Sequence, residues 1–149
     1  MKKVPIRVKR LPNSAGLDLP RYATELSAGT DLLAAIESSV ILQPGERVSL
    51  PTGIAIALPK GYEAQIRPRS GLAIKYGVTC LNSPGTIDPD YRGELCIILI
   101  NHGQEKFKIK RGMRIAQLVL STYSTLSWLD SETLDQTKRG EGGLGSTGK

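Results

Sequence analysis

Aromatic residues are scarce in this chain of 149 residues: they make up 5% of it, with one Phe and one Trp. The core must therefore be built mainly from Ile, Leu and Val. The 16 glycines and 9 prolines supply many turn positions and interrupt helices, which argues against a long helical bundle. A chain of this length is expected to form one compact domain.

Cysteine is also rare, and both Cys80 and Cys96 lie inside apolar stretches. A small secreted fold held by disulfides would need an even and larger number of cysteines spaced along the chain. We therefore interpret both thiols as reduced, small core hydrophobes. The sequence has no run of about 18 apolar residues, and no apolar segment follows its basic first residues. These absences favour a soluble, cytoplasmic protein without a membrane partner.

Acidic residues are outnumbered by basic ones, and the formal net charge is +6. The excess lies at the two chain ends, which leaves the body between them close to neutral. A broad nucleic-acid-binding face would need clustered phosphate contacts, so no nucleic acid partner is expected. The basic N-terminus is interpreted as a solubilising end strand. The charges at the ends come from Lys2, Lys3, Arg7, Lys9 and Arg10, and from Lys138, Arg139 and Lys149.

Short apolar segments broken by turn residues predict many β-strands. Residues 40–42 precede Gln-Pro-Gly, and residues 53–58 precede Pro-Lys-Gly, both of which are strand-and-turn signals. The continuous apolar run 95–100 is expected to be a strand buried on both faces. Residues 112–120 predict a further strand. Together these segments predict an all-β fold, a jelly roll or distorted barrel.

A single helical signal interrupts this pattern. Ser70 can cap a short helix over residues 71–76, which Gly77 would end. Residues 1–120 are therefore interpreted as the β domain and residues 121–138 as an exposed connector. Residues 139–149 contain five glycines and cannot pack a core. Composition alone favours a disordered tail, although a glycine-rich backbone also suits the wrapping of phosphate oxygens.

Two segments carry side chains suited to phosphate chemistry. Arg69 offers charge-assisted donors just ahead of the expected helix, where Gly71 lets a ligand approach the backbone. An anion site and a plain helix cap with solvated arginines both fit this segment. In residues 82–94, Asp88 lies between an apolar residue and the rigid Pro89, as a positioned general base would. If this expected hairpin faces Arg69, a water between the two could hydrolyse a phosphoanhydride.

Metal ligands are few in the sequence. His102 is the only histidine and follows an Asn in an expected turn, so it is interpreted as a surface residue. A hard cation such as Mg²⁺ would be held mainly by substrate phosphates, with Asp31 reached through water.

Five segments follow one another in a characteristic order: residues 28–35, 67–75, 82–94, 111–118 and 139–148. Together they resemble the ordered motifs of the trimeric deoxyuridine triphosphate nucleotidohydrolases, the dUTPases. A copy of the first motif also occurs at residues 14–19. The copy at residue 28 leads directly into the expected strand and turn, so Asp18 is given no functional role.

The resemblance implies a β jelly-roll homotrimer with three active sites, each assembled from three chains. Motifs one, two and four would come from one subunit, the third from a second, and the glycine-rich arm, residues 139–149, from the third. The implied reaction is Mg²⁺-dependent hydrolysis of dUTP to dUMP and pyrophosphate, with Asp88 activating water for attack on the α-phosphate. This reaction would remove dUTP from the nucleotide pool and supply dUMP for thymidylate synthesis.

The resemblance also assigns the substrate contacts. Tyr91 would press against the deoxyribose and exclude a 2′-hydroxyl, and Leu144 would cover the uracil where the family usually carries Phe. Loss of that ring predicts weaker closure of the arm, by roughly 0.5–1.5 kcal/mol. The phosphates would be bound by Arg69, Ser70, Gly71, Gln117, Arg139, Gly145 and Ser146, and the uracil by Asn82, Gly85, Thr86, Ile87 and Cys96.

Two other functions are weighed against this one. A dCTP deaminase has a similar fold, but at the positions of Ile74 and Ile98 that family carries an Arg and a catalytic Glu. Ile98 cannot shuttle a proton to an amino group, which argues against deamination. A deaminase or a bifunctional relative is kept as the first alternative. A nucleotide-binding module without turnover is the other, and the presence of Asp88 argues against it.

Overall fold

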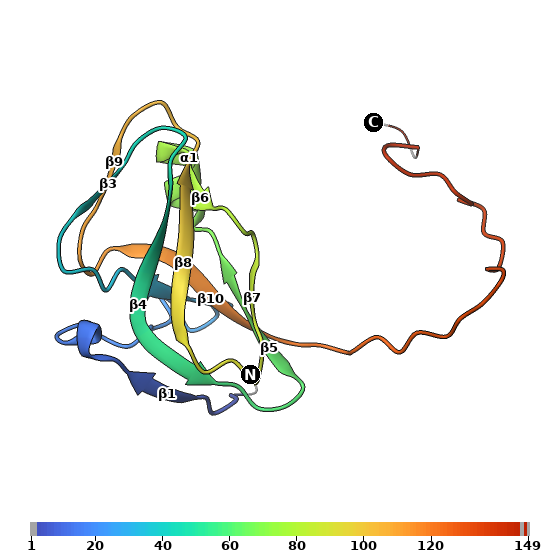
Figure 1. The fold of residues 1–149 in the computed structure, drawn as a ribbon, viewed down its shortest axis with the longest axis horizontal. Coiled ribbons are helices and arrows are strands. Elements are labelled where there is room, and N and C mark those ends of the chain that lie inside the picture. Colours follow the sequence, from blue (N-terminus) through green and yellow to red (C-terminus); the bar gives the residue numbers. More distant parts are fainter. Residues whose placement is uncertain (1–2, 147, 149) are drawn as a thin grey trace.

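The computed structural model describes residues 3–146 and 148, whose strands form two four-stranded antiparallel sheets and one two-stranded ladder (Figure 1). The first sheet has the order β1 (Arg7–Arg10), β4 (Arg47–Ala57), β8 (Glu94–Asn101) and β6 (Val78–Cys80). The second has the order β2 (Gly29–Leu33), β10 (Arg114–Thr122), β5 (Tyr62–Arg67) and β7 (Gly85–Ile87). The ladder pairs β3 (Val40–Leu42) with β9 (Phe107–Ile109). The predicted all-β jelly roll is confirmed.

The core lies between the two large sheets and is aliphatic, as the scarcity of aromatics predicts. Leu95, Ile97 and Leu99 of β8 are fully buried, and Leu32 and Ile66 face them from the second sheet. Successive side chains of a strand point to opposite faces, so every second residue of β8 enters the core. Each such side chain contributes about 1.5–3 kcal/mol on burial.

The prediction that residues 95–100 are buried on both faces is wrong for this chain. Ile98 and Ile100 are only half-buried, and Cys96 is exposed. They occupy the outer face of the sheet, which no other element of the described chain covers completely. The interpretation of Cys96 as a core residue is therefore wrong, whereas that of Cys80 is confirmed. Burial raises the pKa of the Cys80 thiol to about 11, so this sulfur is an unsuitable nucleophile at neutral pH.

Two strands extend beyond their predicted bounds. β4 begins at Arg47, before the predicted start at residue 53, because a shift of register between Pro51 and Ala55 lets the strand continue past Pro and Gly. β10 runs from Arg114 to Thr122, two residues into the predicted connector. Residues 62 and 63 of β5 pair with these last two positions.

Two short helical segments accompany the sheets. α1 (Ser70–Tyr76) ends at Gly77, whose left-handed backbone (φ 67°) donates its N–H to the Ala73 carbonyl, as predicted. The expectation that Ser70 caps this helix is wrong: Arg69 holds the N-cap position without a side-chain cap bond, and Ser70 is the first helical residue. A single 3₁₀ turn, η1 (Pro12–Ser14), follows β1. No helix in the described residues is long and apolar enough to cross a membrane.

Asn101 is the largest polar side chain in the core, and it ties β8 to two neighbouring segments. Its Nδ2 donates to the carbonyls of Leu42 (3.0 Å) and Glu105 (2.8 Å), and its Oδ1 accepts from Gly103 N–H (2.8 Å).

Asn101→Ala is expected to lower the free energy of unfolding by about 3 kcal/mol, because it leaves buried backbone groups unpaired. Urea unfolding measures this loss. Gln104→Ala, in the exposed turn beside it, is the control and should change little. A loss no larger than that of the control would contradict the structural role of Asn101.

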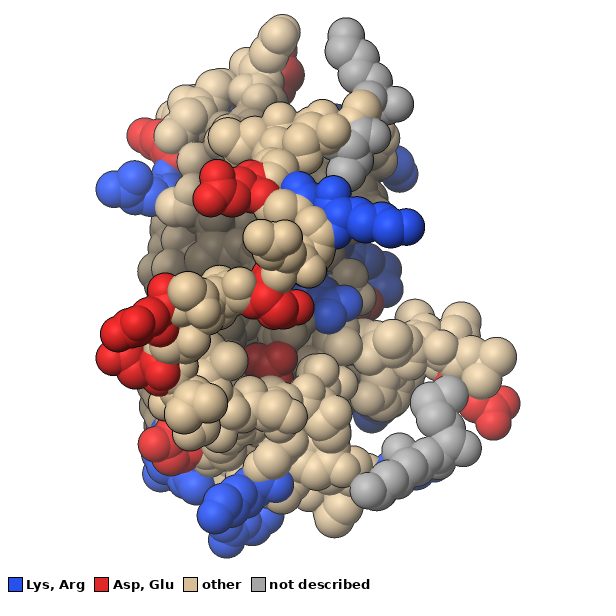
Figure 2. Space-filling model, turned by 90° about the vertical axis from the view of Figure 1, so that its right-hand side faces the viewer, with Lys and Arg blue, Asp and Glu red and all other residues tan. Residues whose placement is uncertain are grey.

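The chain leaves the second sheet after β10 and runs away from the body as an extended segment (Figure 1). Beyond Tyr123, the hydrogen bonds found among the described residues are all local. Leu126, Trp128, Leu129 and Leu134 are each at least 77% exposed. The side of the molecule that lies on the right in Figure 1 carries both acidic and basic side chains (Figure 2). Lys2 and Lys149 of the charged ends, and Thr147 of the arm, lie outside the described residues.

Candidate active site

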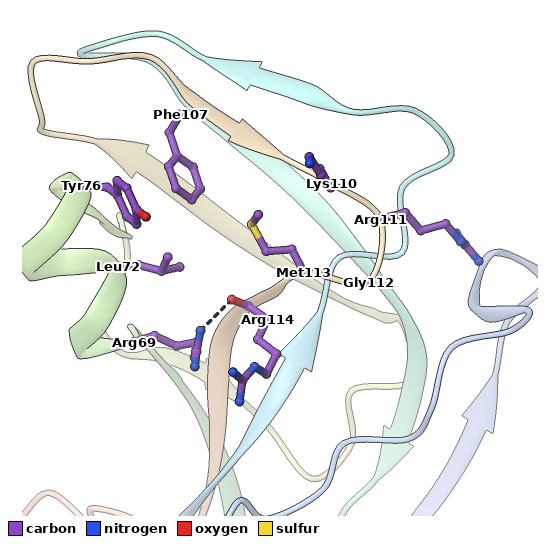
Figure 3. A pocket seen from close by; sticks show the side chains of 9 residues that line it. All are labelled: Arg69, Leu72, Tyr76, Phe107, Lys110, Arg111, Gly112, Met113 and Arg114. Atoms are coloured by element: carbon purple, nitrogen blue, oxygen red, sulfur yellow. Dashed lines mark hydrogen bonds between the residues drawn. The ribbon is translucent and has the colours of Figure 1, made fainter.

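Asp31 on β2 forms the centre of a charged cluster. Its Oδ1 lies 2.9 Å from Nε of Arg69, and its Oδ2 lies 3.2 Å from Nη1 of Arg114. The Arg69 guanidinium also donates to the Arg114 carbonyl at 3.1 Å (Figure 3). Two guanidinium groups thus meet one carboxylate, which leaves an excess of positive charge suited to an anion.

Gln117 stands beside this cluster because β10 pairs with both β2 and β5. Its Cα lies opposite those of Asp31 and Arg67. The side-chain amide donates to the Pro68 carbonyl at 3.0 Å. A Cβ on Gly29 would overlap its Oε1 and lie 3.2 Å from its Cδ, so only glycine leaves room for this amide.

The start of α1 is open to solvent on the same side. Ser70 and Gly71 are both exposed. A Cβ at Gly71 would meet nothing within 4 Å, so the space over this backbone is free. The structure therefore places Arg69, Ser70, Gly71 and Gln117 in one region.

A cavity of about 530 Å³ adjoins this cluster between α1 and the turn from β9 to β10 (Figure 3). Its inner wall is apolar, and its basic residues lie at the edge. Arg111 points away from it and donates to the carbonyls of Ile36, Asn13 and Ala15, so it holds the N-terminal segment in place. The lining residues are Arg69, Leu72, Tyr76, Phe107, Lys110, Arg111, Gly112, Met113 and Arg114.

A second cavity, of about 230 Å³, lies where β7 leads toward β8. Five of the six residues that line it were predicted from the sequence: Asp88 as the general base, and the other four as contacts of dUTP. The sixth, Glu94, was missed, because a carboxylate at the start of an apolar strand carries no distinguishing mark in one sequence. The lining residues are Thr86, Ile87, Asp88, Tyr91, Glu94 and Cys96.

The segment around this cavity is not the hairpin that was predicted. β7 pairs with β5 in one sheet, and β8 pairs with β4 and β6 in the other. The segment therefore crosses from one sheet to the other, which opens a hollow between them. Asn82 belongs to the same region, since its Nδ2 would lie 3.0 Å from a Cβ on Gly85.

Asp88 lies at the cavity in a turn closed by its own backbone. Its carbonyl accepts the N–H of Tyr91 at 3.2 Å, and Arg92 donates to the Pro89 carbonyl at 2.7 Å. The Asp88 side chain is exposed, and the ion pairs found among the described residues do not involve it. A carboxylate held in this way is accessible to a water molecule and to substrate.

The two groups of residues lie apart in the single chain. Ile87 pairs with Ala64 of β5, and Arg69 follows five residues beyond that partner. β5 continues from Ala64 to Arg67 before Arg69 is reached, and at about 3.3 Å per residue this stretch of strand alone spans roughly 10 Å. The two cavities share no lining residue. One chain therefore does not bring the expected base and the expected phosphate donors together.

The described residues of the predicted arm, 139–146 and 148, line neither cavity in the single chain. Nε of Arg139 donates to the Gly142 carbonyl at 2.7 Å, and Ser146 N–H donates to Gly143 at 3.0 Å. Leu144 is fully exposed and has a left-handed backbone, with φ of 45°. Arg139, Leu144, Gly145 and Ser146 are thus placed in local turns without contact to the sheets.

The histidine and the isoleucines considered for a metal site or for deamination line neither cavity. The surface position of His102 is confirmed. Ile98 is half-buried on β8 and Ile74 is 84% exposed on α1, and an isoleucine at either position offers no polar group. Asp18 forms an exposed ion pair with Arg21 at 3.5 Å. No group of three or more His, Cys, Asp or Glu within the described residues could hold a metal ion.

Solved structures share this fold. A dUTPase of Staphylococcus bacteriophage 80alpha, a single-residue mutant with dUpNHpp, has a TM-score of 0.87 at 26% identity, covering 99% of this chain and 100% of the phage chain. A mutant dUTPase of phage phi11 of S. aureus, described with a structural Mg(II) ion, has a TM-score of 0.77 at 24% identity. That match covers 87% of this chain and 98% of the phage chain and shows the fold alone.

Sequence relatives cover nearly the whole chain. The deoxyuridine 5'-triphosphate nucleotidohydrolase of Rickettsia bellii is 60% identical over 143 residues, which cover 96% of this chain and 95% of that protein. The Rickettsia typhi protein of the same name is 55% identical over 148 residues, 99% of each chain. A family model described as dUTPase matches residues 15–148. That match includes the residues that line both cavities and all of the arm except its last residue, and the chain belongs to the dUTPase family.

Proposed function

We propose that this protein hydrolyses dUTP to dUMP and pyrophosphate, with the base and sugar bound in the cavity beside Asp88. The observation that carries this proposal is that Asp88 lines one cavity together with Tyr91 and other residues predicted to bind the nucleoside. The cavity volume of about 230 Å³ is below the roughly 300–1,000 Å³ of sites that enclose a whole drug-sized ligand. It suits the nucleoside part of a nucleotide, whose phosphates extend beyond it.

Asp88 is the general base of the proposed reaction. Its carboxylate takes a proton from a water molecule, whose oxygen forms a bond to the α-phosphorus. The bond from that phosphorus to the bridging oxygen breaks, and pyrophosphate leaves. Proton transfer by a positioned carboxylate accelerates such a step by about 10²–10⁴-fold.

Arg69, Ser70, Gly71 and Gln117 bind the phosphates in this proposal. Guanidinium, hydroxyl, amide and backbone N–H donors stabilise the negative charge that develops on the phosphoryl oxygens. The Arg69 side chain is fixed in place by Asp31, so little reorganisation is needed when substrate binds. Chemistry at the phosphorus is therefore mostly a matter of positioning.

We propose that the active site is assembled in a homotrimer. Asp88 and Arg69 line two different cavities of one chain, so a single chain does not direct both at one phosphate group. The outer face of β8 presents half-buried Ile98 and Ile100, which a second chain would cover. The exposed connector and arm, residues 121–138 and 139–149, would reach a further chain and close over its nucleotide.

Recognition of the nucleoside follows from the same cavity. Asn82 and the backbone from Gly85 to Ile87, with that of Cys96, would pair with the polar edge of uracil. Fixed donors and acceptors reject cytosine, since its amino group leaves one buried partner unpaired. Tyr91 would exclude the 2′-hydroxyl of ribose by contact with the sugar.

Mg²⁺ is the proposed cofactor, and the residues present fit it. Asp31 supplies hard oxygen atoms beside the basic cluster, although both oxygens already accept from arginines. Such a site suits an ion held mainly by substrate phosphates and reached by Asp31 through water. When bound, Mg²⁺ neutralises phosphate charge.

A cytoplasmic location also stays a prediction. The division of the chain into a domain, a connector and an arm at residues 120 and 138 stays a prediction as well.

The test is release of pyrophosphate by the full-length protein with Mg²⁺, measured in parallel on dUTP, dCTP, dTTP and UTP. Hydrolysis confined to dUTP supports the proposal. Release of ammonia from dCTP would favour the deaminase alternative. Binding of a non-hydrolysable dUTP analogue without hydrolysis of dUTP would favour the nucleotide-binding module.

Leu144→Phe is expected to lower the KM for dUTP by about two- to tenfold, because an aromatic ring adds stacking over the uracil to the apolar cover of Leu. Steady-state kinetics at several dUTP concentrations measure this. Leu134→Phe makes the same change in the connector and should leave KM as it is. Equal kinetic constants for the wild type and Leu144→Phe would contradict a role for residue 144 in covering the base.

A further inference from the structure

Glu94 is the lining residue of the smaller cavity without an assigned role, and its carboxylate is held from two sides. Oε1 accepts Nδ2–H of Asn13 at 2.7 Å and the backbone N–H of Gly53 at 2.8 Å. The residue is half-buried. Two donors on one oxygen fix both the side chain and the first residue of β8.

The ring of Tyr91 rests on the same residue. Its hydroxyl donates to the Glu94 carbonyl at 2.9 Å. A Cβ on Gly93 would overlap the Tyr91 hydroxyl oxygen and lie 2.6 Å from Cζ. The ring therefore lies close against the Gly93 backbone, which only glycine leaves open, and its polar end is anchored at Glu94.

The donors to Glu94 are themselves immobilised. Gly53 lies at the shift of register in β4 with φ of +73°, and a Cβ there would come within 2.6 Å of Cβ of Ser14. Its carbonyl accepts the N–H of Leu11 at 2.8 Å. Thr52, next to it, donates its hydroxyl to the Leu95 carbonyl at 2.6 Å. The N-terminal segment, the β4 irregularity and the start of β8 thus form one connected support.

We propose that Glu94 is a positioning residue that sets the selectivity for deoxyribose over ribose. Through its contacts with Asn13 and Gly53 it fixes the carbonyl that anchors Tyr91, and the ring is thereby held where a 2′-hydroxyl would lie. This inference rests on the proposed function, because it assumes that Tyr91 meets the sugar. In this proposal the carboxylate acts through Tyr91 and takes no part in the reaction at the phosphate.

The experiment compares kcat/KM for dUTP and for UTP in the full-length protein. Glu94→Ala is expected to reduce the dUTP preference about tenfold, because Tyr91 loses its fixed anchor. Glu94→Gln keeps an oxygen acceptor for both donors and should retain the wild-type ratio within about twofold. Gly93→Ala forces the ring to move and should reduce the ratio as well, which shows that the assay responds to Tyr91.

The matched control is Glu46→Ala. Glu46 also accepts a backbone N–H, that of Gln43 at 2.9 Å, but it lies at the opposite end of the pairing between β4 and β8. Its removal should leave the ratio unchanged. If Glu94→Ala does not fold, as judged by thermal unfolding, Asn13→Ala removes one donor and is expected to lower the ratio about threefold.

The two proposals fail differently. A wild type that does not hydrolyse dUTP would contradict the proposed function, and calorimetric binding of dUMP against UMP would then measure the same selectivity without turnover. Equal losses on both nucleotides in Glu94→Ala, or a wild-type ratio in that variant, would overturn the role of Glu94 while dUTP hydrolysis stands.

Discussion

Asp88→Asn is expected to reduce kcat for dUTP by about 10²–10⁴-fold while dUTP binding persists. The amide has nearly the same shape as the carboxylate but does not take a proton from water. Asp88 is exposed at the smaller cavity and takes part in none of the ion pairs found in the described chain, so its replacement removes little structural support. Pyrophosphate release under single-turnover conditions measures the chemical step directly.

The matched control is Asp18→Asn, which changes a carboxylate in the copy of the first motif. That side chain is exposed, and its only ion pair within the described residues is with Arg21, so kcat should stay within about twofold of wild type. A comparable loss in both variants would point to a general effect of charge. Full activity in Asp88→Asn would remove the general base from the proposed mechanism.

The strands of the core could be predicted from short apolar runs, but the exposure of their faces could not. Leu95, Cys96 and Ile97 are all apolar in character, and in the chain they alternate between the core and the outer face. One sequence gives the run, whereas the partner of each face depends on which strands and which chains pack against it. The same limit explains the wrong interpretation of Cys96.

The site residues could be found from their motifs, but the distances between them could not. The segment from Asn82 to Glu94 has the turn residues of a hairpin, yet β7 and β8 join different sheets. Turn chemistry fixes local backbone, whereas strand pairing is decided by distant residues such as Ala64. The role proposed for Glu94 depends on its hydrogen bond from Asn13, which is 81 positions away in the sequence, so no local pattern could reveal it.

The connector shows what a single chain leaves incomplete. Its polar residues predict an exposed segment, but Trp128 and Leu129 are 87% and 91% exposed as well. Large apolar surfaces that are exposed in a single chain often mark a site of contact with a partner. Together with the separation of Asp88 from Arg69, this supports a site that needs more than one copy of the chain.

Ending the chain after Lys138 is expected to reduce dUTP hydrolysis by at least about a hundredfold, since Arg139 and Ser146 are proposed donors to the phosphates. Stability of the body should not change, because the described part of the arm makes no hydrogen bond to the sheets. Thermal unfolding and pyrophosphate release separate the two effects. Full activity of the shortened chain would contradict closure by the arm.

A mixing experiment then tests whether the arm acts on a neighbouring chain. The shortened chain keeps Asp88, and full-length Asp88→Asn keeps the arm. If base and arm come from different subunits, co-refolded mixtures contain sites that combine an intact Asp88 with an intact arm, and activity appears that neither parent has. If each chain supplied both parts of its own site, no combination would be complete and the mixture would stay inactive. The shared site predicts recovery.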